Sequence, residues 1–286
     1  MVKHYIRLGL IFSLRLVVAT AVISAFFVLT QDFLIFPGLF SSQILGSVSV
    51  APKDIEVLRV QSSDTHEVVV WKLRGSEKPR TVAILFHGNA EHLHRFVQVQ
   101  RWLLSLGIAS YSVEYRGYSG RGSGWPSEMG LYADSEAVFR LVEKEEQIAP
   151  KDVVVLGSSI GTGVAAYLAQ KANVGTLVLL SPYTSLKNVA AETPLFGLLT
   201  PFMKYEFPSS EYIARLTDTC VIAAHGARDS TISHRHSADL QQRYRGSRSF
   251  NLILEEEAGH NNILKFARNR IEKQLSKCIL ERDLSM

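Results

Sequence analysis

Hydrophobic and polar positions follow two recurring patterns along most of the chain. From about residue 55, short runs rich in β-branched residues are each followed by a stretch with helical periodicity. Runs such as VVVL (153–156) and LVLL (177–180) are apolar at every position, which is typical of strands covered on both faces. Alternating strands and helices favour parallel pairing, so the pattern predicts one α/β domain over residues 55–286.

The pattern predicts eight strands and five long helices within this domain. The strands are expected at 55–60, 67–73, 81–86, 108–115, 152–157, 176–181, 220–225 and 250–255, and the helices near 91–106, 131–147, 160–172, 234–245 and 262–283. The first two strands have no helix between them. We therefore expect an antiparallel start to a mostly parallel eight-stranded sheet flanked by helices.

An apolar segment precedes the domain. Residues 8–30 form 23 consecutive positions in which Arg15 is the single charge. As a helix they extend about 34 Å, enough for a hydrocarbon core of about 30 Å. Lys3 and Arg7 precede the segment and the next basic residue is Lys53. The positive-inside rule then predicts a single-pass anchor (residues 1–30) with a cytoplasmic N-terminus and a translocated domain.

Two other interpretations of the segment stay open. Ala19-Thr20-Ala21 has the small residues of a signal-peptide cleavage site, although the apolar run continues beyond it to Thr30. A buried core helix is the other alternative. Residues 31–54 form a juxtamembrane arm that carries Phe33, Phe36 and Phe40, and this arm either lies at the membrane interface or packs against the domain.

Composition excludes several classes of protein. Of 286 residues, 47% are hydrophobic and 20% charged, which excludes a disordered or coiled-coil chain, and one apolar segment excludes a multi-pass membrane protein. The net charge is +4 and the basic residues are dispersed, so no nucleic-acid partner is expected. Two cysteines cannot form a disulfide framework or a zinc site alone. Cys220 lies in an apolar strand and is interpreted as a packed core thiol; whether it meets Cys278 is open.

A nucleophile elbow is predicted after the fifth strand. The sequence GSSIG (157–161) is G-x-S-x-G placed directly between a strand and a helical pattern. The chemistry requires this arrangement, because a tight turn lifts the central serine hydroxyl above the sheet and the flanking glycines allow strand and helix to approach. The centre of the pattern is Ser159, and Ser158 is a poorer second choice.

Candidates for the base and the acid follow in the order that this kind of site requires. A serine hydroxyl needs a base, and the base needs an orienting carboxylate. Asp229 lies in HGARD (225–229) after the seventh strand, and His260 lies in AGHNN (258–262) after the eighth. The order serine, acid, histidine, each at a strand end, predicts a catalytic triad.

The oxyanion hole is expected from backbone N–H groups of Ile160, directly after the nucleophile, and of Asn89, in the loop after the third strand. His87, His92 and His94 lie nearby, but no carboxylate cluster accompanies them at ligand spacing. We therefore expect neither a metal nor another cofactor.

These residues resemble the α/β-hydrolase superfamily. More narrowly, they resemble single-pass, membrane-anchored serine hydrolases of the bud-emergence type, which are related to eukaryotic α/β-hydrolase-domain lipid hydrolases and depalmitoylases. The resemblance covers about residues 30–275, and its landmarks are LFHGNAE (85–91), YRGY (115–118), PSEMGLYAD (126–134), GSSIGTG (157–163), LLSPYTSL (179–186), HGARD (225–229) and AGHNN (258–262). It implies the α/β-hydrolase fold, the triad Ser159, Asp229 and His260, and an oxyanion hole at Asn89 and Ile160.

Three features depart from this family pattern. Ser158 stands before the nucleophile where Arg, His or Gln is expected, which alters pocket polarity. The glycine-rich stretch SGRGSGW (119–125) is looser than in relatives. The cysteine-rich N-terminus of the lipidated depalmitoylases is absent, which argues against placement among them.

The expected function is hydrolysis of a small-molecule or lipid-derived acyl ester or thioester through an acyl-enzyme. A lid-like insertion at 187–216 is apolar enough to suit an acyl chain, with Phe196, Leu199 and Phe202 as candidate pocket residues; simple coverage of the sheet is equally compatible. A membrane-bound serine peptidase and a non-catalytic binding protein remain as alternatives. The sequence leaves the oligomeric state open.

Overall fold

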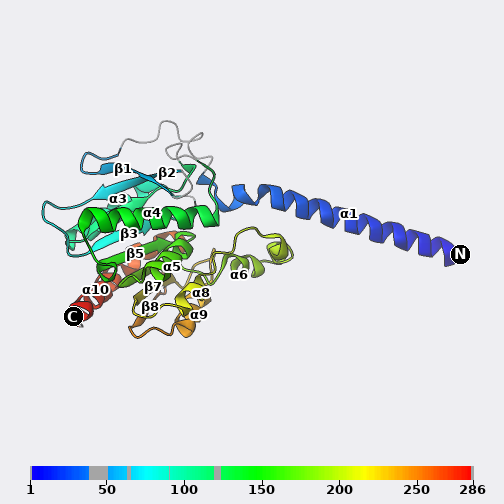
Figure 1. Cartoon of the computed structure of the whole chain (residues 1–286). Helices are drawn as coiled ribbons and strands as arrows, with labels where there is room; N and C mark the ends of the chain where they lie inside the picture. Colours follow the sequence, from blue (N-terminus) through cyan, green and yellow to red (C-terminus); the bar gives the residue numbers. More distant parts are fainter. Residues whose placement is uncertain (1, 39–50, 63–65, 90, 119–123, 285–286) are drawn as a thin grey trace.

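An eight-stranded sheet forms the centre of the protein, in the order β1-β2-β4-β3-β5-β6-β7-β8 (Figure 1). The computed structural model describes residues 2–38, 51–62, 66–89, 91–118 and 124–284. The strands are β1 (Glu56–Gln61), β2 (Glu67–Leu73), β3 (Val82–Phe86), β4 (Ala109–Val113), β5 (Val153–Ser158), β6 (Thr176–Leu180), β7 (Cys220–Gly226) and β8 (Phe250–Glu255). β1–β2 and β2–β4 pair antiparallel and all other neighbours pair parallel, which confirms the predicted mostly parallel sheet with an antiparallel start.

Helices cover both faces of this sheet. On one face lie α4 (Glu128–Glu146), α5 (Gly161–Ala172), α8 (Ser209–Ala214) and α9 (Arg235–Arg243), and on the other lie α3 (Leu93–Ser105) and α10 (Ile263–Leu284). The short elements are α6 (Leu186–Ala191), α7 (Pro194–Gly197), η2 (Pro150–Asp152), η3 (Thr200–Phe202) and η4 (His260–Asn262). Successive residues of β5 point to opposite faces of the sheet. Val155 packs with α4, α5, α8 and α9, and Val154 packs with α3 and α10, which explains why the strand is apolar at every position.

Most element boundaries lie within three residues of their predicted positions. The largest shift among the long helices is the start of α4, which begins at Glu128 and not at 131. Its N-cap is Ser127, whose hydroxyl accepts a hydrogen bond from the Gly130 N–H at 3.1 Å. A serine cap satisfies a backbone donor that the first turn leaves unpaired, so the helix starts before its apolar periodicity does.

The helix α1 (Val2–Ile35) projects from one end of the domain (Figure 1). Among the described residues it is the one helix long and apolar enough to cross a membrane. It continues five residues beyond the predicted end of the span at Thr30, into the predicted arm. Its described side chains are exposed from His4 to Ile23, and burial begins at Ser24. The helix therefore stands free over most of its length and meets the domain near its C-terminal end.

The contact between α1 and the domain, which we call the α1 junction, is polar at its centre. Gln31 is fully buried, accepts a hydrogen bond from the Lys204 N–H at 2.7 Å and donates to the Phe202 carbonyl oxygen at 3.2 Å. Asp32 accepts from the Tyr205 hydroxyl at 2.9 Å and pairs with the Lys204 ammonium at 3.1 Å. Both ends of the Gln31 amide are thus satisfied by the insertion, which ties the insertion to α1.

The arm after α1 packs against the domain as far as the structure describes it. Phe36 is fully buried and its ring meets that of Tyr205 at 5.2 Å between centroids. Gly38 lies so close to Tyr118 that a Cβ there would come within 2.0 Å of Tyr118 Cε2. Phe33 contacts Trp125 edge to face at 5.8 Å. Phe40 and most of the glycine-rich stretch 119–125 lie outside the described residues.

Cys220 and Cys278 form a disulfide with a Cα–Cα distance of 5.9 Å. Cys220 is packed in the core as predicted, but it is a half-cystine and not the predicted thiol. Cys220 begins β7 and Cys278 faces it from α10. Their 58-residue separation made the pairing invisible to sequence spacing, because only the packing of α10 against the sheet brings them together.

A buried ion pair fixes the chain between β4 and α4. Arg116 and Asp134 side chains are each 3% exposed, and the Arg116 Nε donates to Asp134 Oδ2 at 2.8 Å. A second guanidinium nitrogen of Arg116 contacts the other carboxylate oxygen. The pair is therefore bidentate, the geometry that matches a guanidinium to a carboxylate.

Candidate active site

Ser159 lies in a strained turn between β5 and α5. Its φ angle is 52°, in the left-handed region that residues with a Cβ seldom adopt. Two glycines allow the turn, because a Cβ at Gly157 would meet the Gly161 carbonyl oxygen at 2.4 Å and one at Gly161 would meet the Phe86 carbonyl oxygen at 2.4 Å. The turn places the serine at the carboxyl end of the parallel strands, where open α/β sheets carry their sites.

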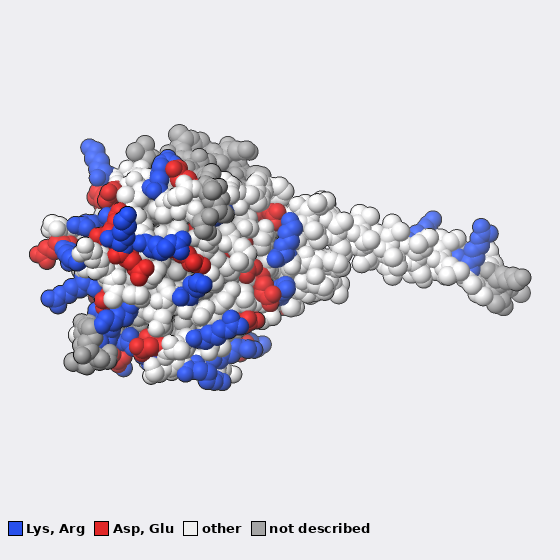
Figure 2. All heavy atoms as spheres, viewed as in Figure 1, with Lys and Arg blue, Asp and Glu red and all other residues white. Residues whose placement is uncertain are grey.

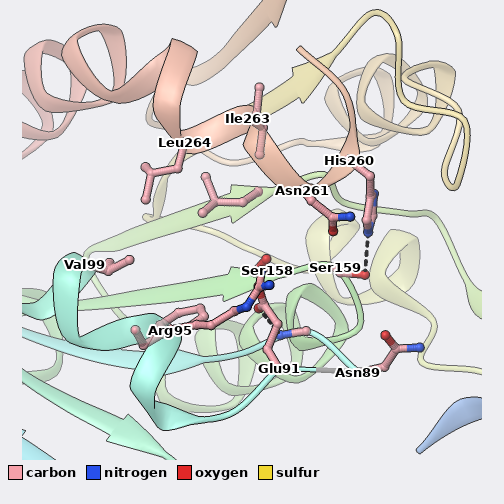
Figure 3. A pocket seen from close by; sticks show the side chains of 13 residues that line it. Asn89, Glu91, Arg95, Val99, Ser158, Ser159, His260, Asn261, Ile263 and Leu264 are labelled. Carbon is pink, nitrogen blue, oxygen red and sulfur yellow. Dashed lines mark hydrogen bonds and ion pairs between the residues drawn. The ribbon is translucent and has the colours of Figure 1, made fainter. Parts of the chain in front are cut away.

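Ser159, His260 and Asp229 form one hydrogen-bonded chain. His260 Nε2 lies 3.0 Å from Ser159 Oγ, and His260 Nδ1 lies 2.7 Å from Asp229 Oδ2. Figure 3 shows the first of these contacts as a dashed line, with His260 above Ser159. The three residues follow β5, β7 and β8, so the parallel sheet brings them to one edge from positions up to 101 residues apart.

The side chain of Asp229 is fully buried and is held by four groups. Its Oδ1 accepts from the backbone N–H groups of Thr231 and Ile232, each at 2.9 Å. Its Oδ2 lies 2.7 Å from His260 and 3.2 Å from His225. Burial alone raises the pKa of Asp229, but the hydrogen bonds from His225, His260 and the Ile232 N–H outweigh it and hold that pKa well below its usual range.

His225 was not predicted from the sequence, although it lies four residues before Asp229. Its Nδ1 is 2.7 Å from Ser237 Oγ, and its Nε2 is 3.0 Å from the Ile232 carbonyl oxygen. Since Nε2 faces a carbonyl and a carboxylate, the network assigns the proton to Nε2 and the Ser237 hydroxyl as donor to Nδ1. The sequence feature that could have indicated this role is the polar His225 at the end of the otherwise apolar run CVIAAH (220–225).

The two expected oxyanion donors come from the residue after Ser159 and from the loop after β3. Ile160 directly precedes α5, so its N–H belongs to the helix N-terminus, where backbone donors have no intrahelical acceptor. Its carbonyl oxygen accepts from the Tyr183 hydroxyl at 3.1 Å. Asn89 lines the cavity beside Ser159, and its carbonyl oxygen accepts from the Tyr118 hydroxyl at 2.8 Å. Burial raises the pKa of Tyr118, which keeps its phenol a proton donor.

A cavity of about 350 Å³ opens beside Ser159. Its lining residues are Gly88, Asn89, Glu91, Arg95, Phe96, Val99, Ser158, Ser159, Leu180, His260, Asn261, Ile263 and Leu264. Figure 3 shows Ile263 and Leu264 on one side and Arg95 and Glu91 across from them, with Val99 next to Arg95. Glu91 accepts from the Gly88 N–H at 2.8 Å and lies 3.8 Å from Arg95. None of the lining residues from α3 was predicted from the sequence.

The predicted pocket residues Phe196, Leu199 and Phe202 are not among those that line this cavity, so their assignment to it is corrected. The insertion turns toward α1. Phe196 meets the ring of Phe27 at 6.4 Å between centroids, and Phe202 lines an apolar groove along α1. An apolar helical face predicts that a segment packs against an apolar surface. It does not tell whether that surface is a substrate pocket or another helix, which here is α1.

Comparisons with known proteins agree with this fold. A family model described as serine aminopeptidase, S33 matches residues 77–242. The chain is 30% identical over 217 residues to human α/β hydrolase domain-containing protein 17B, covering 73% of this chain and 70% of that protein. It is 31% identical over 221 residues to α/β hydrolase domain-containing protein 17C of Xenopus tropicalis, covering 74% and 66%.

Solved structures show the same architecture at low sequence identity. An α/β hydrolase from Vibrio vulnificus superposes with a TM-score of 0.68 at 18% identity, over 85% of this chain and 92% of that chain. The esterase Pf2001 of Pyrococcus furiosus superposes with a TM-score of 0.66 at 16% identity, over 82% and 97%. At these identities the likeness concerns the fold alone.

Proposed function

Because the chain belongs to the α/β-hydrolase family, we propose that it is a serine hydrolase that cleaves carboxylic esters or thioesters through an acyl-enzyme. One observation carries the proposal: Ser159 Oγ, His260 and Asp229 are joined by contacts of 3.0 and 2.7 Å on a serine whose φ is 52°. A nucleophile, a base within hydrogen-bond reach and a carboxylate that orients the base make up the triad arrangement.

In the proposed mechanism His260 Nε2 accepts the Ser159 proton while Ser159 Oγ attacks the substrate carbonyl carbon. The carbonyl oxygen becomes an oxyanion, held by the N–H groups of Ile160 and Asn89. Asp229 stays ionised, because its pKa is held low, and it stabilises the imidazolium. Collapse expels the alcohol or thiol, which takes the proton from His260. Water, activated by His260, then cleaves the acyl-enzyme and restores Ser159.

The cavity supports a modest, largely apolar substrate group. Its volume of about 350 Å³ lies near the lower end of the 300–1,000 Å³ range of small-molecule sites. Five apolar side chains from α3, β6 and α10 line it, which suits an acyl chain or an apolar alcohol.

A serine aminopeptidase is the second candidate, favoured by the description of the family model and by Glu91 in the cavity. A carboxylate there can bind the amino terminus of a peptide. Glu91 already accepts from the Gly88 N–H and faces Arg95, so we place this activity second. Acyl p-nitrophenyl esters compared with aminoacyl anilides distinguish the two, since an aminopeptidase prefers anilides and loses that preference in Glu91→Gln.

We also propose that α1 anchors the protein in a membrane, with the N-terminus in the cytoplasm and the catalytic domain on the other side. The exposed apolar length of α1 supports the anchor, and Lys3 and Arg7 at its start support the orientation. The Cys220–Cys278 disulfide supports it independently, because disulfides persist in extracellular, lumenal and periplasmic compartments and seldom in the cytosol.

Fluorophosphonate labelling of the full-length protein tests the proposal. We expect wild type to be labelled and Ser159→Ala to be unlabelled and inactive, with hydrolysis reduced about 10⁶-fold. Ser158→Ala is the matched control in the same turn and should keep labelling. A labelled and active Ser159→Ala variant contradicts the assignment, and a folded wild type that resists every serine-directed probe favours a non-catalytic binding protein.

A further inference from the structure

The insertion beside α1 exposes large apolar side chains that no part of the catalytic site uses. We call residues 196–202 the insertion tip. Within it Leu198 is 79% exposed, Phe202 44% and Phe196 39%. Figure 2 shows the tapered end of the domain next to α1 as white and continuous with the helix, while charged side chains gather on the body of the domain. Exposed apolar patches of this kind mark contact surfaces.

The insertion tip lies alongside the apolar part of α1 and not beyond it. Phe196 contacts Phe27, which is one helical turn before the end of the apolar segment at Thr30. Phe202 shares a groove with α1 side chains, which are Leu16, Val17, Thr20, Ala21, Ser24, Ala25, Val28 and Leu29. Ser24 lies about 9 Å along the helix from Thr30. The tip thus flanks positions that belong to the span.

The first charged residues after the apolar stretches of α1 and of the insertion lie side by side. Asp32 is the first charged residue on α1 after Arg15, and Lys204 is the first after the insertion tip. The two pair directly at 3.1 Å, and Tyr205 joins them. The Asp32–Lys204 pair therefore marks a boundary. The insertion tip and the free part of α1 lie on its apolar side, and the rest of the domain lies on its polar side.

We propose that the insertion tip enters the same lipid leaflet from which α1 emerges, so that the domain has two membrane contacts. The inference rests on the proposed anchoring by α1. The bilayer is the occupant because the tip is continuous with the spanning surface of α1, while the buried Gln31 amide prevents the tip from moving apart from the helix. Phenylalanine and leucine at such a depth contribute apolar contact with acyl chains.

An environment-sensitive probe on full-length protein in phosphatidylcholine vesicles tests this. The native cysteines are joined in the disulfide, so Leu198→Cys can be labelled singly with a nitrobenzoxadiazole dye. Leu280→Cys on α10 is the matched control, since Leu280 is 63% exposed and apolar. Leu16→Cys reports on the span itself.

We expect the probes at 198 and 16 to shift to the blue and to be quenched by nitroxide-labelled lipids, and the probe at 280 to remain in water. A quenched probe at 16 with an unquenched probe at 198 overturns the second contact. An unquenched probe at 16 removes the anchor and overturns the inference with it. No readout depends on hydrolysis, so a failure of the proposed enzymatic activity is seen separately.

Discussion

Two buried aspartates show how differently a carboxylate can be used in one fold. Asp134 pairs with Arg116, whose charge is permanent. Asp229 pairs with the imidazoles of His225 and His260, and its remaining oxygen accepts two backbone N–H groups. The first pair holds the chain between β4 and α4 in place. The second leaves a proton on His260 that can move, which is what a catalytic site requires.

Asp229→Asn should show the largest difference between the two aspartates, because it should lower kcat without unfolding the protein. An amide cannot hold the His260 tautomer or stabilise its imidazolium, so we expect kcat on a soluble ester to fall about 10⁴-fold. Circular dichroism should show an unchanged fold, because the backbone N–H partners can still reach an amide oxygen. A kcat within tenfold of wild type would contradict the role assigned to Asp229.

Asp134→Asn should act on stability and not on chemistry. Removing the carboxylate charge from a buried pair leaves the buried Arg116 charge without its counter-ion in this pair, so we expect a loss of about 3–5 kcal/mol in the free energy of unfolding. Chemical denaturation in detergent measures it, with Asp229→Asn as control. The folded fraction should keep the kcat of wild type. A large fall in kcat at unchanged stability would erase the distinction drawn between the two carboxylates.

Loss of the disulfide should affect the C-terminal segment that carries Asp229 and His260. The bond closes a segment of 58-residue separation that contains both residues. In the Cys220→Ser/Cys278→Ser double variant we expect unfolding to become easier by about 2–4 kcal/mol, because the unfolded chain regains freedom. Reduction of wild type with dithiothreitol should give the same shift. Equal unfolding curves with and without reductant would argue against the pairing.

His225→Gln should have a smaller effect that is confined to Asp229. A hydrogen bond to a charged group is worth about 1.5–3 kcal/mol, so kcat should fall about 10–100-fold. Ser237→Ala is the control, because it removes the partner of His225 Nδ1 and leaves the Nε2 contact with Asp229. Kinetics on a soluble ester measure both. An unchanged kcat in His225→Gln would make that histidine a packing residue.

The smallest expected effect is the loss of folding stability at acidic pH that Asp229 causes. The pKa of Asp229 is lower in the folded protein than its unfolded value of 3.8, so the ionised carboxylate contributes stability that is present above pH 3.8 and is lost as pH falls below it. Between pH 5 and pH 3 wild type should lose about 1 kcal/mol relative to Asp229→Asn. Urea unfolding of both proteins measures the difference, and parallel pH dependences would contradict it.

The sequence predicted at which strand ends the three candidate site residues lie, for a physical reason. Ser159, Asp229 and His260 each follow an apolar strand, and parallel strands bring their carboxyl ends to one edge. The sheet and the geometry of these three residues therefore follow from local patterns. Their catalytic roles remain proposals.

Three other features depend on packing that no local pattern encodes. An apolar insertion can cover a pocket, a sheet or a helix. The contacts of Gln31 and Asp32 with the insertion are what place Phe196 and Phe202 beside α1. The disulfide requires α10 to lie on β7. His225 belongs to an apolar strand, and its contact with Asp229 arises because the chain turns back after Gly226.

The α1 junction has a mechanical consequence. Transmembrane helices are tilted by about 20° from the bilayer normal on average, and they tilt further where the bilayer is thinner than their apolar length. Gln31 and Asp32 tie α1 to the insertion through three hydrogen bonds and an ion pair, so a tilt of the helix must rotate the whole domain by the same angle. Where α1 spans a membrane, the orientation of the Ser159 cavity relative to the lipid surface therefore changes with the thickness of that bilayer.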